Sequence, residues 1–159
     1  MTIGVGGGAS PGHRPGLPLR IVAVLPSPVE VPAFDAEAAW QDLSSALKGL
    51  EAQNLVSIER VLPATEQALK QRLGRDTCHA LHFIGHANWR AAARYGTLVF
   101  ENSSRASRSV TTPCLGNLLA QHQSVGLTVI QPCGRDAAFD ASAAALWERG
   151  PAVIVSEGT

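Results

Sequence analysis

The sequence has no excess of charge of either sign, because its 159 residues carry 13 basic and 13 acidic side chains. Proteins that bind nucleic acid or anionic membrane surfaces depend on clustered positive charge, so neither partner is expected. Cysteine is also scarce. Cys78, Cys114 and Cys133 are odd in number and none lies in a CxxC pair. This count argues against a disulfide framework and predicts a reducing, cytoplasmic location.

Long apolar runs are missing as well. No segment approaches the length of a membrane span, and the Gly- and Pro-rich residues 1–18 lack the continuous apolar core of a signal peptide. We therefore expect residues 1–18 to be a flexible leader. Residues 19–159 are expected to form one domain, which is long enough to enclose a single core.

What the chain does contain is a regular alternation of short apolar runs and helical segments. Apolar runs bounded by Gly or Pro predict buried strands at 20–25, 55–61 (near a sheet edge), 81–84, 127–130 and 152–155. Helices are expected after the caps Asp35, Thr65 and Thr112, the second ending at Gly74, and again at 141–149. A hairpin is expected with one arm at 96–100 and a polar tip at 102–109. This alternation predicts an α/β fold, a three-layer sandwich with a mostly parallel sheet.

Two of the predicted strands stop abruptly at polar, reactive residues. Strand 81–84 leads through Gly85 to His86, and strand 127–130 leads through Pro132 to Cys133. Ligands of α/β proteins bind at the carboxyl ends of the strands, so both side chains should reach the same edge. A Cys and a His at one site are the parts of a thiol nucleophile and its acid/base partner. A nearby His, and the amino end of a helix after Cys133, would favour the thiolate.

The strings LHFIGH (residues 81–86) and VIQPCG (129–134) resemble the two motifs of caspase-like peptidases, and among these most closely the CHAT family. The resemblance covers about residues 19–156. It implies a caspase-like fold and a cysteine endopeptidase with a catalytic His86–Cys133 dyad. It also implies an oxyanion hole formed by the backbone N–H groups near Ala87 and of Cys133. No metal or organic cofactor would be needed.

The resemblance also implies partners. The substrate would be a protein or peptide, and a fused or separate sensor or repeat module would regulate the enzyme, as in bacterial defence systems. The sequence departs from the family pattern in having Ala87 after the His instead of Gly, and Pro132 before the Cys instead of Ala. The family carries one or two further strand–helix units, so we expect the domain to be incomplete at its carboxyl end and a missing segment to be a partner. The isolated chain is then expected to have little or no peptidase activity. The alternative is a non-catalytic interaction module that kept the fold.

Substrate binding is expected to involve Gln131 and Asp136. In caspase-like folds the residue two before the nucleophile lines the pocket for the side chain that precedes the scissile bond. Gln131 offers an uncharged amide there, which predicts weak cleavage after Lys or Arg. Asp136 lies close enough in sequence to supply a carboxylate.

A zinc site is the competing interpretation, with Cys78, His79, His82, His86 and Cys133 as ligands. In an extended strand His82 and His86 are about 13 Å apart, at ~3.3 Å per residue, whereas both would have to lie within about 2.1 Å of one ion. We therefore expect no metal. His82 is expected to be a buried or half-buried strand residue.

Overall fold

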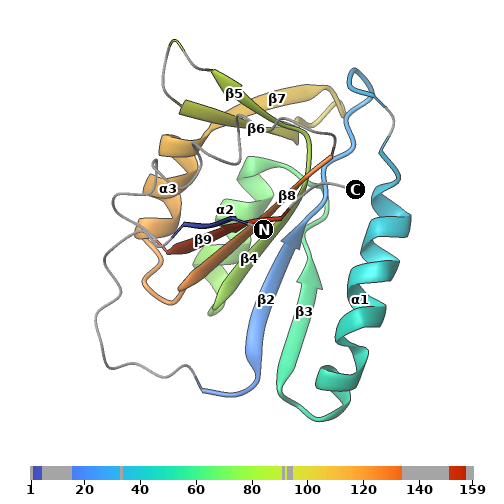
Figure 1. Ribbon diagram of the computed structural model, residues 1–159, viewed down its shortest axis with the longest axis vertical. Helices are drawn as coiled ribbons and strands as arrows, with labels where there is room; N and C mark the ends of the chain where they lie inside the picture. Colours follow the sequence, from blue (N-terminus) through green and yellow to red (C-terminus); the bar gives the residue numbers. More distant parts are fainter. Residues whose placement is uncertain are drawn as a thin grey trace.

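A six-stranded sheet forms the centre of the computed structural model, which describes residues 2–4, 16–32, 34–90, 92, 95–133 and 151–156. Its order is β1-β9-β8-β4-β2-β3, and the five strands from β9 to β3 are mutually parallel (Figure 1). The strands are β1 (Thr2–Gly4), β2 (Leu19–Val24), β3 (Val56–Arg60), β4 (Ala80–Gly85), β8 (Leu127–Pro132) and β9 (Ala152–Val155). The five parallel strands are those predicted, and β3 is at a sheet edge as expected.

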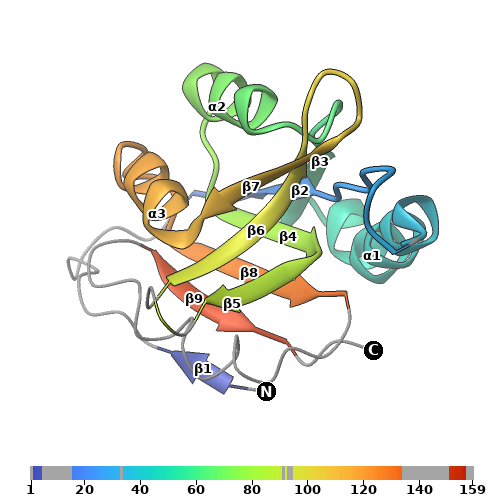
Figure 2. The same cartoon turned by 90° about the horizontal axis from the view of Figure 1, so that it is seen from above.

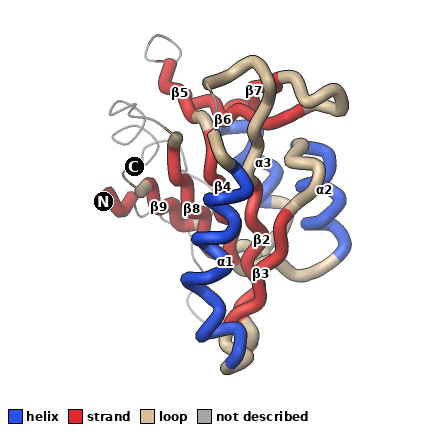
Figure 3. The backbone as a smooth tube through the Cα atoms, turned by 90° about the vertical axis from the view of Figure 1, so that its right-hand side faces the viewer, coloured by secondary structure: helices blue, strands red, loops and turns tan. Residues whose placement is uncertain are grey.

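Helices cover both faces of this sheet. Helix α1 (Ala36–Ala52) lies on one face, and α2 (Glu66–Arg75) and α3 (Thr112–Ala120) lie on the other (Figures 2 and 3). The described chain is therefore an α/β structure in three layers, as the alternation of strands and helices predicted. None of the described helices is long and apolar enough to cross a membrane.

Helix caps follow the sequence signals with two corrections. Asp35 and Thr65 cap α1 and α2 as predicted, each accepting a hydrogen bond from the backbone N–H three residues on. Gly74 does not stop α2, which continues to Arg75 because Arg72 and Arg75 both pair with Glu59 and hold its last turn.

The second correction concerns α3. Its cap is Thr111 rather than Thr112, because the Thr111 Oγ1 accepts a hydrogen bond from the N–H of Cys114 at 3.3 Å. Thr112 is then the first helical residue, and Pro113 lies in the first turn, where its missing N–H costs nothing.

A small antiparallel sheet, of order β5-β6-β7, lies at the end of the large sheet where the parallel strands finish (Figure 1). Its strands are β5 (Ala87–Arg90), β6 (Tyr95–Glu101) and β7 (Ser107–Thr111). The expected hairpin is confirmed, but the turn is limited to residues 102–106, since 107–109 belong to β7. Strand β5 was not predicted, although it begins directly after His86.

The core has a part on each face of the large sheet. The larger cluster, on the α2 and α3 side, includes Phe83 and Phe100, whose ring centroids are 5.4 Å apart. The smaller cluster joins α1 to Ile84 and, at its margin, Cys133. Successive strand residues face opposite sides, so β8 presents Ile130 to the larger cluster and directs Gln131 and Cys133 to the α1 side.

Part of the expected leader is a strand. Thr2–Gly4 form β1 and pair antiparallel with β9, with Ile3 opposite Ile154. The reason is that the outer edge of β9 offers unpaired N–H and C=O groups, which an extended segment can satisfy. Much of the remaining leader, the helix expected at 141–149 and Asp136 lie outside the described residues.

Candidate active site

Strand register brings His86 and Cys133 to the same point. Strands β4 and β8 are parallel neighbours with Gly85 opposite Pro132, so the next residue of each strand is His86 and Cys133. Neighbouring strands lie about 4.8 Å apart, and the two residues therefore begin their loops side by side. Both are half-buried, and both line one pocket of about 660 Å³.

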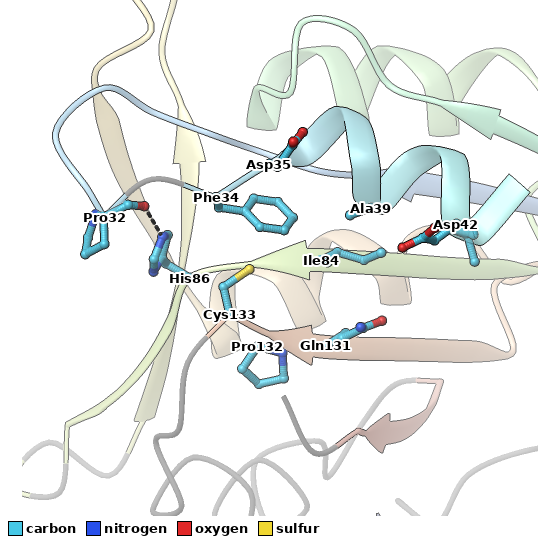
Figure 4. Close-up of a pocket in the computed structure, with 11 residues that line it drawn as sticks. Pro32, Phe34, Asp35, Ala39, Asp42, Ile84, His86, Gln131, Pro132 and Cys133 are labelled. Carbon is cyan, nitrogen blue, oxygen red and sulfur yellow. Dashed lines mark hydrogen bonds between the residues drawn. The ribbon is translucent and has the colours of Figure 1, made fainter. Parts of the chain in front are cut away.

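The pocket lies between the end of the sheet and α1 (Figure 4). Strands β4 and β8 contribute its floor through Ile84 and Gln131. The facing wall comes from the loop between β2 and α1 and from α1 itself, with the lining side chains Pro32, Phe34, Asp35 and Asp42. The sequence analysis named Gln131 for this pocket, and the structure places it there, but the whole facing wall was missed. Because β2 ends at the same sheet edge, its following loop was the signal that could have revealed it.

Two hydrogen bonds hold His86. Its Nε2 lies 3.1 Å from the carbonyl oxygen of Pro32, and its own carbonyl accepts a hydrogen bond from the N–H of Val99 in β6 at 2.9 Å. A carbonyl oxygen can only accept, so Nε2 carries the hydrogen and Nδ1 is the unprotonated nitrogen of the neutral ring. In Figure 4 the imidazole lies between Pro32 and Cys133. The ring is therefore fixed in the tautomer that leaves Nδ1 able to accept a proton.

Cys133 is a protonated thiol in this structure. Burial raises its pKa to about 11, so the thiolate is rare at neutral pH. Among the described contacts, none joins its Sγ to His86 by a hydrogen bond, and the described contact of the imidazole is the one between Nε2 and the Pro32 carbonyl. The expected stabilisation of the thiolate is thus absent in the described residues, and the helix that was to follow Cys133 lies outside them. For Cys133 to act as a nucleophile its thiol would first have to lose a proton, and His86 lines the same pocket.

The oxyanion donors differ from expectation at one position. The backbone N–H of Cys133 donates to the carbonyl of Gly85 at 2.9 Å, so it continues the ladder between β4 and β8 and is not a free donor. Ala87 is different. His86 and Val99 form a hydrogen-bonded pair across β5 and β6, and in an antiparallel ladder the next pair, Ala87 and Leu98, does not. The N–H of Ala87 therefore points away from β6, toward the open edge of β5.

The charge of the pocket is negative. Asp35 and Asp42, seven residues apart and so on one side of α1, both line it. Asp35 uses one carboxylate oxygen to cap α1, accepting from the N–H of Ala38 at 2.9 Å. Asp42 is exposed and extends the pocket on the side of Gln131. The pocket that holds the uncharged amide of Gln131 thus also holds carboxylates from the α1 side, which the sequence analysis did not name.

The residues of the zinc alternative are dispersed. Cys78 is in the core, its Sγ donates to the carbonyl of Ala80, and burial raises its pKa to about 11. His79 lies at the opposite end of β4 from His86, and its Nδ1 accepts a hydrogen bond from the N–H of Arg20 at 2.9 Å. His82 is half-buried as expected, and burial lowers its pKa. No group of three metal-binding side chains occurs in the part of the chain that the structure describes.

Comparison with known families finds no family model that matches this chain. A comparison with curated proteins likewise finds no match.

Proposed function

We propose that this chain is a cysteine endopeptidase with a caspase-like fold of the CHAT type, using His86 and Cys133 as its catalytic dyad. The observation that supports the proposal most strongly is the register of β4 and β8, which starts both loops at one level of the sheet. The pocket beside the two side chains, enclosed on the far side by α1, gives a substrate residue a place to bind. The proposed substrates are proteins or peptides.

The reaction would begin when Nδ1 of His86 accepts the proton of the Cys133 thiol. The sulfur then attacks the scissile carbonyl carbon, and the N–H of Ala87 is the donor available for the oxyanion. The imidazolium returns its proton to the leaving amine, which departs and leaves an acyl-thioester on Cys133. Water, deprotonated by His86, attacks this thioester and releases the acid and the thiol. Pro32 assists because its carbonyl stabilises the N–H of the imidazolium.

Regulation is proposed to come from a sensor or repeat module, fused or separate, in a bacterial defence system in the cytoplasm.

A non-catalytic interaction module is the second candidate. Two observations favour it: burial raises the pKa of Cys133 to about 11, and the N–H of Cys133 is already bonded to Gly85. A protein that had lost turnover would show both features and would keep the pocket for binding alone.

The two candidates differ in hydrolysis. A pool of internally quenched peptides is incubated with the wild type, with Cys133→Ala and with the matched control Cys114→Ala, which changes an exposed thiol remote from the pocket. The peptidase proposal expects slow cleavage by the wild type and the control, because the isolated chain is expected to have little activity, and none by Cys133→Ala. Binding of peptides without cleavage in all three proteins would support the interaction module instead.

A further inference from the structure

The loop between β2 and α1 is attached to the turn between β6 and β7. The N–H of Val29 donates to the carbonyl of Arg105 at 3.1 Å, and the Glu30 Oε2 accepts from both the N–H and the hydroxyl of Ser107, at 2.9 and 2.5 Å. The N–H of Ser27 donates to the Glu101 Oε1 at 2.7 Å. These contacts join two segments more than 70 residues apart in the chain.

The same loop reaches His86 two residues after Glu30. Pro32 presents its carbonyl to the Nε2 of His86, and the carbonyl of His86 is in turn bonded to Val99 of β6. These contacts form a closed ring of interactions, called the circuit below. It runs from the His86 carbonyl to β6, along β6 and its turn to Ser107 of β7, from Ser107 to Glu30, and through Pro32 back to the imidazole of His86.

This part of the loop is exposed, although Phe34 after it packs against the smaller core cluster. Val29 is 71 % exposed, and Glu30 and Pro32 are exposed as well. Few buried contacts therefore hold the Pro32 carbonyl in place, whereas Glu30 is held by two hydrogen bonds from one residue of a regular strand. Arg105 has φ of 60°, a left-handed conformation that shapes the turn and aims its carbonyl at Val29.

We propose that Glu30, bound to Ser107, is a positioning residue for His86. It keeps the Pro32 carbonyl on Nε2 and so keeps Nδ1 available to the thiol of Cys133. This inference rests on the proposed peptidase function and identifies a residue that positions the proposed base of that same site. A displacement of Ser107, the first residue of β7 after the β6–β7 turn, would move Glu30 and with it the Pro32 carbonyl. Such a displacement would change the position of the His86 imidazole.

The experiment compares Glu30→Ala with two conservative variants. Glu30→Gln keeps an oxygen that can accept from Ser107, and Ser107→Thr keeps both the hydroxyl and the N–H. Ser109→Ala is the matched control, since Ser109 is exposed on the same strand and takes no part in the circuit. Two quantities are measured on the full chain: the rate at which iodoacetamide alkylates Cys133, resolved by peptide mass spectrometry, and the ¹⁵N chemical shifts of the His86 imidazole, which report the tautomer.

Glu30→Ala should slow alkylation of Cys133 about fivefold, the order expected from one lost hydrogen bond, and shift His86 toward a mixture of tautomers. Glu30→Gln, Ser107→Thr and Ser109→Ala should each stay close to the wild type in both quantities. The inference is overturned if Glu30→Ala leaves the rate and the imidazole shifts unchanged while His86→Ala slows alkylation. If His86→Ala has no effect either, the proposed function itself is wrong. A Glu30→Ala protein that loses its folded spectrum would show a general structural role, which also overturns the inference.

Discussion

At Gly85, the residue before His86, the backbone passes very close to its neighbours. A Cβ placed there would lie 3.2 Å from the Phe83 Cζ and 3.2 Å from the Pro26 Cδ. Phe83 is fully buried in the larger core cluster and has no free space to move into. Gly85 is thus favoured at this position because any larger residue would press its Cβ against the packed ring of Phe83.

Gly85→Ala should lower the free energy of unfolding by about 1–3 kcal/mol, the usual effect of overpacking a filled core. Urea unfolding followed by circular dichroism measures it. Gly49→Ala is the control, because Gly49 lies inside α1 with no atom within 4 Å of the added Cβ, and there the change should stabilise by about 1 kcal/mol through helix propensity. Equal stability of the wild type and Gly85→Ala would show that the Phe83 ring can move aside.

Asp42 gives the pocket a negative charge beside the uncharged amide of Gln131. In the proposed peptidase, Asp42→Asn should reduce kcat/KM for peptides with Lys or Arg before the scissile bond by about two- to fivefold, since an exposed carboxylate contributes up to about 1 kcal/mol. Peptides with Gln at that position should be cleaved as before. Glu37→Gln removes the same charge from α1 outside the pocket and should change neither rate. A uniform loss for Lys, Arg and Gln peptides would mean that Asp42 acts on the shape of the pocket.

At the scale of elements, the contact between the β2–α1 loop and β7 is stronger when Glu30 is ionised. The hydroxyl of Ser107 and then its N–H lower the pKa of Glu30 below its ordinary value of 4.5, because both donate to the charged form. A carboxyl with a depressed pKa contributes its stabilisation above the ordinary value and loses it as the pH falls through the depressed one. The contact is therefore complete above pH 4.5.

The backbone amide resonance of Ser107 should accordingly titrate with a midpoint below 4.5. A series of two-dimensional ¹H–¹⁵N spectra over the acid range measures it. Glu30→Gln, which cannot ionise, should abolish the transition. A midpoint at or above 4.5 would contradict the hydrogen bonds between Glu30 and Ser107.

The sequence predicted the elements whose signals are local and strong. Apolar runs closed by Gly or Pro located the five parallel strands, and the placement of His86 and Cys133 at two strand ends predicted that they meet. Strand β5 escaped because four residues without an apolar pattern carry no strand signal. Pro32 escaped for a different reason: it contributes a backbone carbonyl, and the sequence of a loop does not reveal where its carbonyls point.

Other differences come from interactions between distant segments. Gly74 is a reasonable helix end, but Glu59 of β3 pairs with both arginines of the last turn and extends α2 beyond it. Likewise, the raised pKa of Cys133 follows from burial against the α1 side of the sheet, which no motif around the cysteine encodes. Spacing alone can place a thiol at a strand end, whereas its ionisation depends on what packs against it.

At the scale of the whole molecule, the parallel sheet brings two residues that are 47 positions apart in the sequence into one site. His86 follows β4 and Cys133 follows the neighbouring strand β8. Helix α1 and the β2–α1 loop then close the pocket over that pair. On the far edge of the sheet β1 pairs antiparallel with β9, so this edge of β9 is occupied. We propose that this arrangement makes His86 the base for Cys133.

The most direct test is the rate of alkylation of Cys133 by iodoacetamide at neutral pH in the wild type and in His86→Ala. Each cysteine is followed separately, with exposed Cys114 as the internal reference and His122→Ala as the control histidine outside the pocket. Cys133 should react faster than buried Cys78 in the wild type, and His86→Ala should slow it about tenfold or more, the smaller part of what a positioned base contributes. Cys114 should be unaffected, and His122→Ala should match the wild type. Equal rates for Cys133 with and without the His86 imidazole would contradict the dyad.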